Sequence, residues 1–272
     1  MTADVTSAGE EVGNPALYRL LAWLSPAFPT GAFSYSHGLE AAAAAGIVHD
    51  RGSLQAWIAA LVVHGSARID ADMMRDAWRG ARAEDKTALA VAYRRSAAYR
   101  ATAELALESA QQGGAFLAAY EAAWAAPHPG PLPASGEGES SSGAGQTSPR
   151  PACGGREEPA PQAREGEGET GRQVWSHSAM FGAAAAQAGI ALADALVGYL
   201  QAFAANIISA GLRLGIVGQT DGQRILAALE PVIAAAAAAS QRRSAEDFGS
   251  AGFAADLLSM QHETQYSRLF RS

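Results

Sequence analysis

The chain has 272 residues, of which 49% are hydrophobic, and this is enough apolar material to bury a sizeable core in a soluble globular protein. Its formal net charge of −7 argues against a nucleic-acid partner, because no excess of positive charge is available to neutralise phosphates. The single cysteine, Cys153, excludes an intramolecular disulfide framework and a multi-cysteine zinc site, and it fits a reducing cytoplasm.

The first elements are expected to be a flexible N-terminus and two helices. Residues 1–13 carry acidic side chains and no apolar run, so they do not read as a secretory signal. Asn14 and Pro15 are typical of a helix start, and the helix that follows should bury Leu17, Leu20, Leu21 and Leu24 before Ser25-Pro26 ends it. Ser53 is expected to cap a second long helix whose apolar positions recur every three or four residues.

Between these helices lies the segment PAFPTGAFSYSHGLE, residues 26–40. Pro29-Thr30-Gly31 predicts a tight turn in which Gly31 takes a positive φ. Ser36 is expected to cap a helix that starts within 37–40, and Gly38 near that start indicates close approach by another backbone. Two interpretations are open: a loop folded onto its own core, or a pre-formed surface that another protein contacts.

The rest of the chain also has helical periodicity. Further helices are predicted at about 70–82, 85–99, 100–125, 174–188 and 191–214. Residues 220–223 have capping-box spacing and should start another, with Pro231 kinking it or opening the next. Residues 195–212 lack charges, but polar and small residues favour a buried helix over a membrane span. No alternating β pattern is present, so the predicted fold is all-α, a bundle of roughly eight to ten helices.

Residues 127–172 differ from everything around them. They hold eight of the twelve prolines and ten of the 29 glycines, with no valine, isoleucine, methionine or aromatic residue, so they cannot bury enough apolar area to offset chain entropy. We expect a disordered insertion here, within a single all-α domain made of residues 14–126 and 173–260. Residues 261–272 are expected to form a separate C-terminal tail.

Residue patterns for several kinds of catalysis are missing. Lys86 is the only lysine and follows acidic residues in a helical context, so there is no phosphate-binding loop, and Ser34 and Ser36 lack the G-x-S-x-G elbow of a serine hydrolase. His37 and Glu40 form an H-x-x-E pair that Glu104 and Glu108 could complement, but a second E-x-x-H motif is absent. A binding protein without a cofactor is therefore favoured, and the alternative is a helical-bundle metal-dependent oxidase using His37 and Glu40.

Three regions in the expected order resemble the UreF family of urease accessory proteins. They are SPAFPTGAFSYSHGLE at 25–40, Asn206 and Arg213 followed by VGQTDGQR at 217–224, and MQHETQYSRLFRS at 260–272. The resemblance covers about 17–126 and 173–272, and the insertion is its main departure. It implies an all-helical, cytoplasmic protein that catalyses no reaction itself, forms a homodimer, and binds a UreD/UreH-type accessory protein, a UreG-type GTPase and apo-urease. On this view the protein gates GTP-dependent nickel delivery and binds neither membrane nor nucleic acid.

The resemblance also implies which residues contact partners. The expected partner-binding residues are Pro29, Gly31, Phe33, Ser34, Tyr35, Ser36, Gly38, Glu40, Arg213, Gln219, Thr220, His262, Glu263, Tyr266, Arg268, Leu269 and Phe270. No metal ligand is assigned, although His37, His262 and Glu263 are the polar groups that passing nickel could touch.

The tail is interpreted as a docking peptide for the UreD/UreH-type partner. Tyr266, Leu269 and Phe270 would share one helical face as apolar anchors, while Arg268 and Arg271 would donate to carboxylates on the partner. Deletion of residues 261–272 is then expected to abolish complex formation without unfolding the bundle. The alternative is a frayed last turn packed on its own domain.

Overall fold

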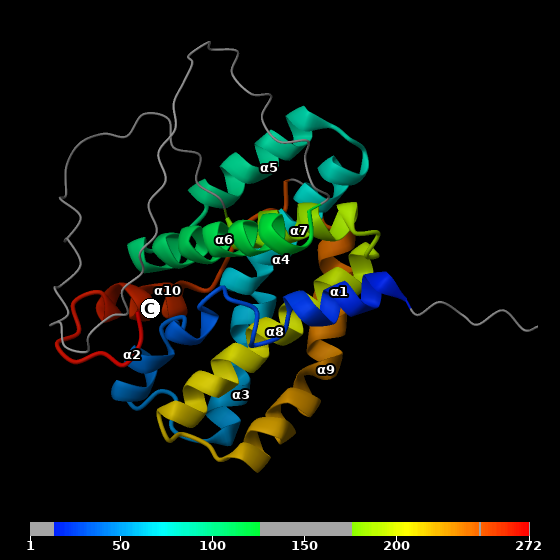
Figure 1. Ribbon diagram of the computed structural model, residues 1–272. Helices are drawn as coiled ribbons and strands as arrows, with labels where there is room; N and C mark the ends of the chain where they lie inside the picture. Colours follow the sequence, from blue (N-terminus) through cyan, green and yellow to red (C-terminus); the bar gives the residue numbers. More distant parts are fainter. Residues whose placement is uncertain (1–13, 126–175, 245, 272) are drawn as a thin grey trace, which may run out of the picture. The chain divides into compact units, whose positions relative to one another are not determined.

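The structure is a computed structural model that describes residues 14–125, 176–244 and 246–271 (Figure 1). Within these ranges it contains ten α-helices, one short 3-10 helix and no strand, which confirms the all-α prediction. The N-terminal residues 1–13, the insertion 127–172 and Cys153 lie outside the described residues. The helices are α1 (Pro15–Trp23), α2 (Leu39–Ala44), α3 (Arg51–Val63), α4 (Ser66–Arg82), α5 (Lys86–Ala98), α6 (Ala103–Ala123), α7 (His177–Gln187), α8 (Leu192–Arg213), α9 (Gln219–Arg242) and α10 (Phe253–His262), with the 3-10 helix at Ala32–Ser34.

Side chains cap the starts of α1, α3, α5 and α6, whereas the other described helices start without a side-chain cap hydrogen bond, and three predicted caps are wrong. Ser36 does not cap α2, because Gly38 occupies that position. Asn14 caps α1 as expected, accepting the N–H groups of Ala16 and Leu17 at 3.1 Å. Ser53 does not cap α3, since Asp50 does, and Ser53 lies three residues later, where it completes a capping box. Thr220 does not cap α9 either, because Gly218 occupies that position and Thr220 lies in the first turn.

Two helices near the C-terminus differ from expectation. α9 runs as one element from Gln219 to Arg242 with Pro231 inside it, so Pro231 opens no new helix. α10 was not predicted, although Phe253, Leu257 and Met260 recur with helical spacing. These three side chains are exposed, whereas Leu258, Ser259 and His262 on the opposite face are buried.

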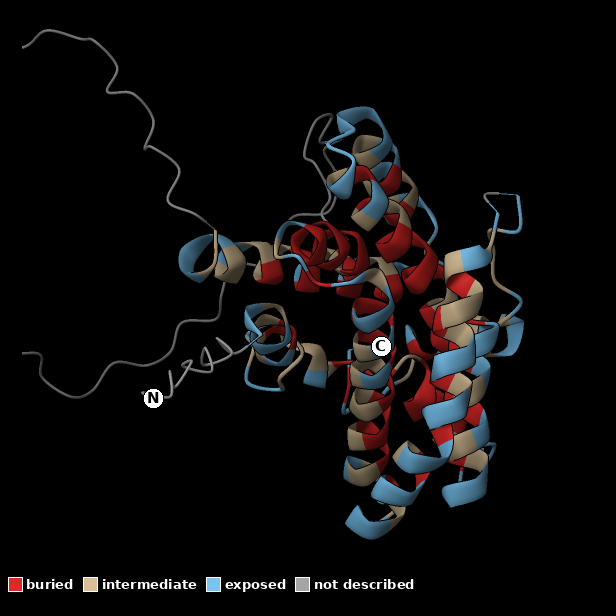
Figure 2. Ribbon diagram, turned by 90° about the vertical axis from the view of Figure 1, so that its right-hand side faces the viewer, coloured by how far each residue is buried: buried red, intermediate tan, exposed pale blue. Residues whose placement is uncertain are grey.

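The core is built around α7, which packs most extensively on α4 and also contacts α5, α6 and α8. Residues 178–186 of α7 are all buried, and Figure 2 shows the buried positions gathered where the helices meet. This segment is rich in alanine and glycine, which lets the helix axes approach closely. A Cβ added at Gly182 would lie 2.3 Å from the Met74 carbonyl oxygen of α4. Trp23 of α1 packs edge to face on Phe116 and on Phe181, whose rings are tilted against each other, and the three side chains form an aromatic cluster.

The described residues up to Trp124 and those from 176 onward pack into one compact unit. Two of its helices, α8 and α9, are long and apolar enough to cross a bilayer by length and composition. This is weak evidence for a membrane protein, since core helices share these properties. Half of the most apolar stretch of α8 is buried, and α8 packs on α9 and on α3. The prediction of a buried helix at 195–212 agrees with this packing.

Candidate functional site

The segment that begins the site turns the chain through two consecutive left-handed residues. His37 has φ 53° and Gly38 has φ 73°, and α2 starts directly after them. A Cβ at Gly38 would lie 3.2 Å from the carbonyl oxygen of Ala255 and from the nitrogen of Ser259, so the predicted close approach is confirmed and the approaching backbone is α10. Gly31 has φ 73°, as its turn required. The turn sends the side chains of His37 and Glu40 to different partners.

Glu40 belongs to an ionic cluster, the tail clamp, formed by the buried residues Glu40, Glu104 and His262 and by Arg268, whose side chain is 41% exposed. The Glu40 carboxylate accepts the backbone N–H groups of Leu269 and Phe270 at 2.7 and 2.9 Å, and it lies 3.1 Å from His262 Nε2. The Glu104 carboxylate of α6 lies 2.8 Å from His262 Nδ1 and accepts from Arg268 at 2.8 Å. Four chain segments, α2, α6, α10 and the tail, meet in this cluster.

Beyond the clamp, the end of the chain lies against the first part of the same domain. The Phe270 side chain is 3% exposed, and the Arg213 guanidinium of α8 lies 4.3 Å from its ring centroid. Arg271 donates its backbone N–H to the Ser34 carbonyl at 2.8 Å. The described tail therefore packs on its own domain, which is the alternative left open for residues 261–272.

The expected helical face on the tail is wrong. α10 ends at His262, so Tyr266, Leu269 and Phe270 do not lie on one helix. Phe270 is buried in the core, while Tyr266 is fully exposed and Leu269 is 61% exposed. Arg268, expected to pair with a partner's carboxylate, pairs with Glu104 of the same chain. Only Tyr266 and Leu269 present apolar side chains of the tail to solvent.

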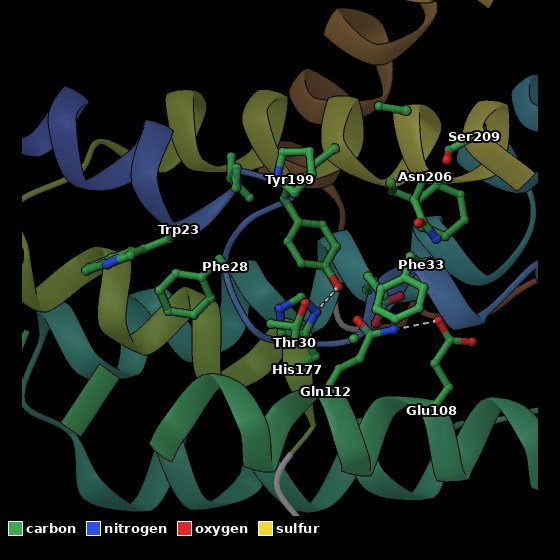
Figure 3. Close-up of a pocket in the computed structure, with 18 of the residues that line it drawn as sticks. Trp23, Phe28, Thr30, Phe33, Glu108, Gln112, His177, Tyr199, Asn206 and Ser209 are labelled. Atoms are coloured by element: carbon green, nitrogen blue, oxygen red, sulfur yellow. Dashed lines mark hydrogen bonds between the residues drawn. The ribbon is translucent and has the colours of Figure 1, made fainter. Parts of the chain in front are cut away.

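Behind the 26–33 loop lies a pocket of about 550 Å³, closed by α6 on one side and α8 on the other. Its walls are partly aromatic, with Phe28, Phe33 and Phe203, and its polar lining includes His37, Asp70, Arg100, Glu108, Gln112, His177 and Tyr199. Figure 3 shows Tyr199 reaching down from α8 toward His177, and Gln112 donating to Glu108 on α6. Glu104 and Glu108 are one helical turn apart, so α6 contributes one carboxylate to the clamp and one to this pocket.

The charges in the pocket are paired. Arg100 donates to Asp70 at 2.8 Å and to Ser176 at 3.0 Å, and His37 Nε2 lies 3.0 Å from Glu108. Burial alone would lower the pKa of His37, but the Glu108 carboxylate more than offsets it and the pKa is raised. For His177, burial dominates and lowers the pKa to about 4, so this imidazole is neutral at pH 7. The pocket therefore combines a paired histidine, a neutral histidine and apolar walls.

The pair proposed for an oxidase is divided between the two clusters. His37 faces Glu108 in the pocket, whereas Glu40 faces His262 in the clamp. Among the residues that the structure describes, no group of three or more His, Cys, Asp or Glu side chains is placed to hold a metal ion. Glu263, the third polar group considered for nickel contact, accepts the N–H of Ala103 at the start of α6.

The remaining expected contact residues divide by exposure. Pro29, Phe33, Arg213, Gln219 and Thr220 have exposed side chains, whereas Tyr35, Ser36, Gly38 and Glu40 are buried in the domain. Tyr35 donates its hydroxyl to Gln111, and its carbonyl accepts from Asn206 at 3.4 Å. The partner contacts of all these residues stay predictions.

Sequence reasoning missed four polar residues of the pocket: Asp70, Arg100, His177 and Tyr199. Asp70 is 5% exposed on α4. The sequence offered one signal of a polar site: charged residues interrupt the apolar positions of α4 at Asp70, Asp72 and Arg75. A buried charge requires a partner, so these positions indicate that other polar groups lie nearby. The sequence offers no means of naming that partner.

Comparison with known proteins supplies the family. The sequence model of the UreF family matches residues 48–230. The urease accessory protein UreF of Granulibacter bethesdensis is 42% identical over 260 residues, which cover 96% of this chain and 95% of that protein. Proteins of the same description from Bradyrhizobium sp. (strain ORS 278) and Rhodopseudomonas palustris (strain BisB18) are 40% and 41% identical, and each alignment covers 94% of this chain and 92% of the relative.

Proposed function

Because the chain belongs to the UreF family of urease accessory proteins, we propose that it is an adaptor that binds a UreD/UreH-type accessory protein and a UreG-type GTPase. In this role it gates GTP-dependent delivery of nickel to apo-urease, with nickel as cargo. It acts in the cytoplasm as a homodimer and catalyses no reaction itself. The accessory role follows from the family, and the partners, the gating and the dimer are the proposal.

The observation that carries the proposal is the pre-ordered tail. An apolar side chain on a flexible peptide must lose conformational freedom when it binds, at a cost of about 0.5–1.5 kcal/mol for each side chain. The tail clamp and buried Phe270 hold the backbone on both sides of Leu269 in place before any partner arrives. Leu269 and Tyr266 are thus presented to solvent, and the exposed face of α10 adds Phe253 and Leu257 at the same end of the domain (Figure 1).

The family resemblance assigns the UreD/UreH-type protein to the tail, and this geometry suits a protein partner there. Apolar side chains that project from a rigid frame and are ringed by charged groups are typical of interaction hot spots. The 26–33 loop and the α8–α9 turn also present exposed side chains, Phe33 and Gln219, and they lie beside the tail, which contacts Ser34 after the loop and Arg213 before the turn. We assign these two surfaces to the UreG-type GTPase and to the second copy of the chain. The proposal does not say which of the two surfaces binds which partner.

The test uses exposed positions, because deletion of residues 261–272 would leave the buried Glu40 and Glu104 without their partners and would unfold more than the tail. In Tyr266→Ala and Leu269→Ala, affinity for the UreD/UreH-type protein of the same urease system should fall at least about 30-fold, which corresponds to the hot-spot threshold of about 2 kcal/mol. Val91→Ala on α5 removes another exposed apolar side chain and should leave affinity unchanged. Titration calorimetry measures both. Unchanged binding in the two tail variants would refute this tail assignment.

A further inference from the structure

Both nitrogens of one buried imidazole face carboxylate oxygens. His262 is 0% exposed, its Nε2 lies 3.1 Å from Glu40 Oε2, and its Nδ1 lies 2.8 Å from Glu104 Oε2. A neutral imidazole has one N–H donor and one lone pair, so in either tautomer one of these contacts would set a lone pair against a carboxylate oxygen. When both carboxyl groups are ionised, both contacts are attractive only if each nitrogen carries a proton.

The proton could in principle sit on a carboxyl group instead, but each carboxylate has other donors that favour its ionised form. Glu40 accepts two backbone N–H groups, from Leu269 and Phe270. Glu104 accepts a charge-assisted hydrogen bond from Arg268. Donors of this kind stabilise a carboxylate and oppose its protonation, so the imidazole is the base that takes the proton.

The charges of the clamp lead to the same conclusion. The charged groups facing His262 are Glu40 from α2, Glu104 from α6 and, through Glu104, Arg268 from the tail. With an imidazolium the two negative and two positive charges cancel. With a neutral imidazole one negative charge is left uncompensated in a site where both carboxylates are at most about a tenth exposed, and this is costly in a low-dielectric interior.

We propose that His262 is a doubly protonated bridge that holds the C-terminal tail on the domain. It acts through Glu40, because His262 orients the carboxylate that accepts the Leu269 and Phe270 N–H groups. His262 is thus a positioning residue. The inference concerns the chain alone and goes beyond the proposed function, because it names the group that keeps Tyr266 and Leu269 in their exposed positions.

The first test reads the protonation state directly. In the full chain with 15N-labelled histidine, the two ring nitrogens of His262, assigned by comparison with His262→Gln, should both have the chemical shift of a protonated nitrogen at pH 7. His177, which is neutral, provides the internal contrast. One unprotonated nitrogen in His262 at this pH would overturn the proposal.

The second test separates charge from shape. His262→Gln keeps one donor and one acceptor but removes the charge, and hydrogen exchange at the Leu269 and Phe270 amides should become at least tenfold faster. Adding Glu104→Gln removes one negative charge, restores neutrality and should slow exchange again. His49→Gln, at an exposed histidine, should change neither amide.

Unchanged exchange in His262→Gln, or a double variant no slower than the single one, would overturn the proposal. If His262→Gln fails to fold, the charge-neutral double variant with Glu104→Gln supplies the assignment of the His262 signals, and the ring-nitrogen measurement on the unaltered chain decides. Neither test includes a partner protein, so a failure here would leave the adaptor proposal untouched, and a failure of the binding test would leave the clamp untouched.

Discussion

The contact between α2 and α10 depends on the absence of a side chain at Gly38, and Gly38→Ala should lower the free energy of unfolding. An added methyl group at Gly38 meets the Ala255 carbonyl oxygen and the Ser259 nitrogen at 3.2 Å. Both are backbone atoms of α10, so they cannot rotate away as a side chain would. Overpacking of this kind typically costs about 1–3 kcal/mol. Pushing α10 outward would also lengthen the contacts of His262 with Glu40, since the clamp joins the same two helices.

Gly46→Ala is the matched control. Gly46 has φ 71° against 73° at Gly38, so both substitutions force alanine into the left-handed region, at about 1–2 kcal/mol each. Nothing lies within 4 Å of a Cβ built at Gly46. The backbone terms therefore cancel when the two variants are compared, and the difference reports the close approach alone.

Urea unfolding of both variants and the parent chain measures the effect. We expect Gly38→Ala to lower the free energy of unfolding by about 1–3 kcal/mol more than Gly46→Ala does, with no change in the denaturant slope. Equal destabilisation in the two variants would refute the reasoning, because it would show that α10 yields to a methyl group at no cost.

Two further predictions concern the pocket. His177 has a pKa of about 4, below its ordinary value of 6.5, so between these pH values the unfolded chain binds a proton that the folded chain does not, and stability falls as the pH drops from about 6.5 toward 4. In His177→Phe the free energy of unfolding should fall by up to about 3 kcal/mol less than in the parent chain over this pH range. Urea unfolding at pH 7 and pH 4.5 measures the difference, and an unchanged pH dependence would contradict the prediction. Arg100→Met leaves Asp70 buried without its cation and should cost about 3–5 kcal/mol by the same assay, most of which Asp70→Asn should restore in the double variant. A double variant no more stable than Arg100→Met would show that the charge at Asp70 is not the cause.

Local features of the fold could be predicted from the sequence because they depend on residues within one turn of each other. The cap at Asn14, the left-handed turn at Gly31 and the helical class are of this kind. The cap at Ser53 was placed wrongly because Asp50 and Ser53 compete within three positions and Asp50 accepts the capping hydrogen bond. The cap at Thr220 was placed wrongly because α9 starts two residues earlier, after Gly218, without a side-chain cap. Even the close approach at Gly38 was readable, as glycine at a helix start has few other uses, but the identity of the approaching helix was not.

Tertiary structure decided how the charged residues pair. Glu40 and His262 are 222 positions apart, and no periodicity links them. The H-x-x-E spacing of His37 and Glu40 suggested that both bind one ligand. The left-handed backbone at His37 and Gly38 instead directs the His37 side chain into the pocket and the Glu40 side chain onto the tail. The sequence indicated that the tail matters, but it did not predict that Phe270 is buried against α8. It also did not predict that the tail pairs with carboxylates of its own chain, because both contacts join residues far apart in the sequence. Secondary structure is encoded within a few residues, whereas a buried charge is stabilised by whichever distant group the packed helices bring to it.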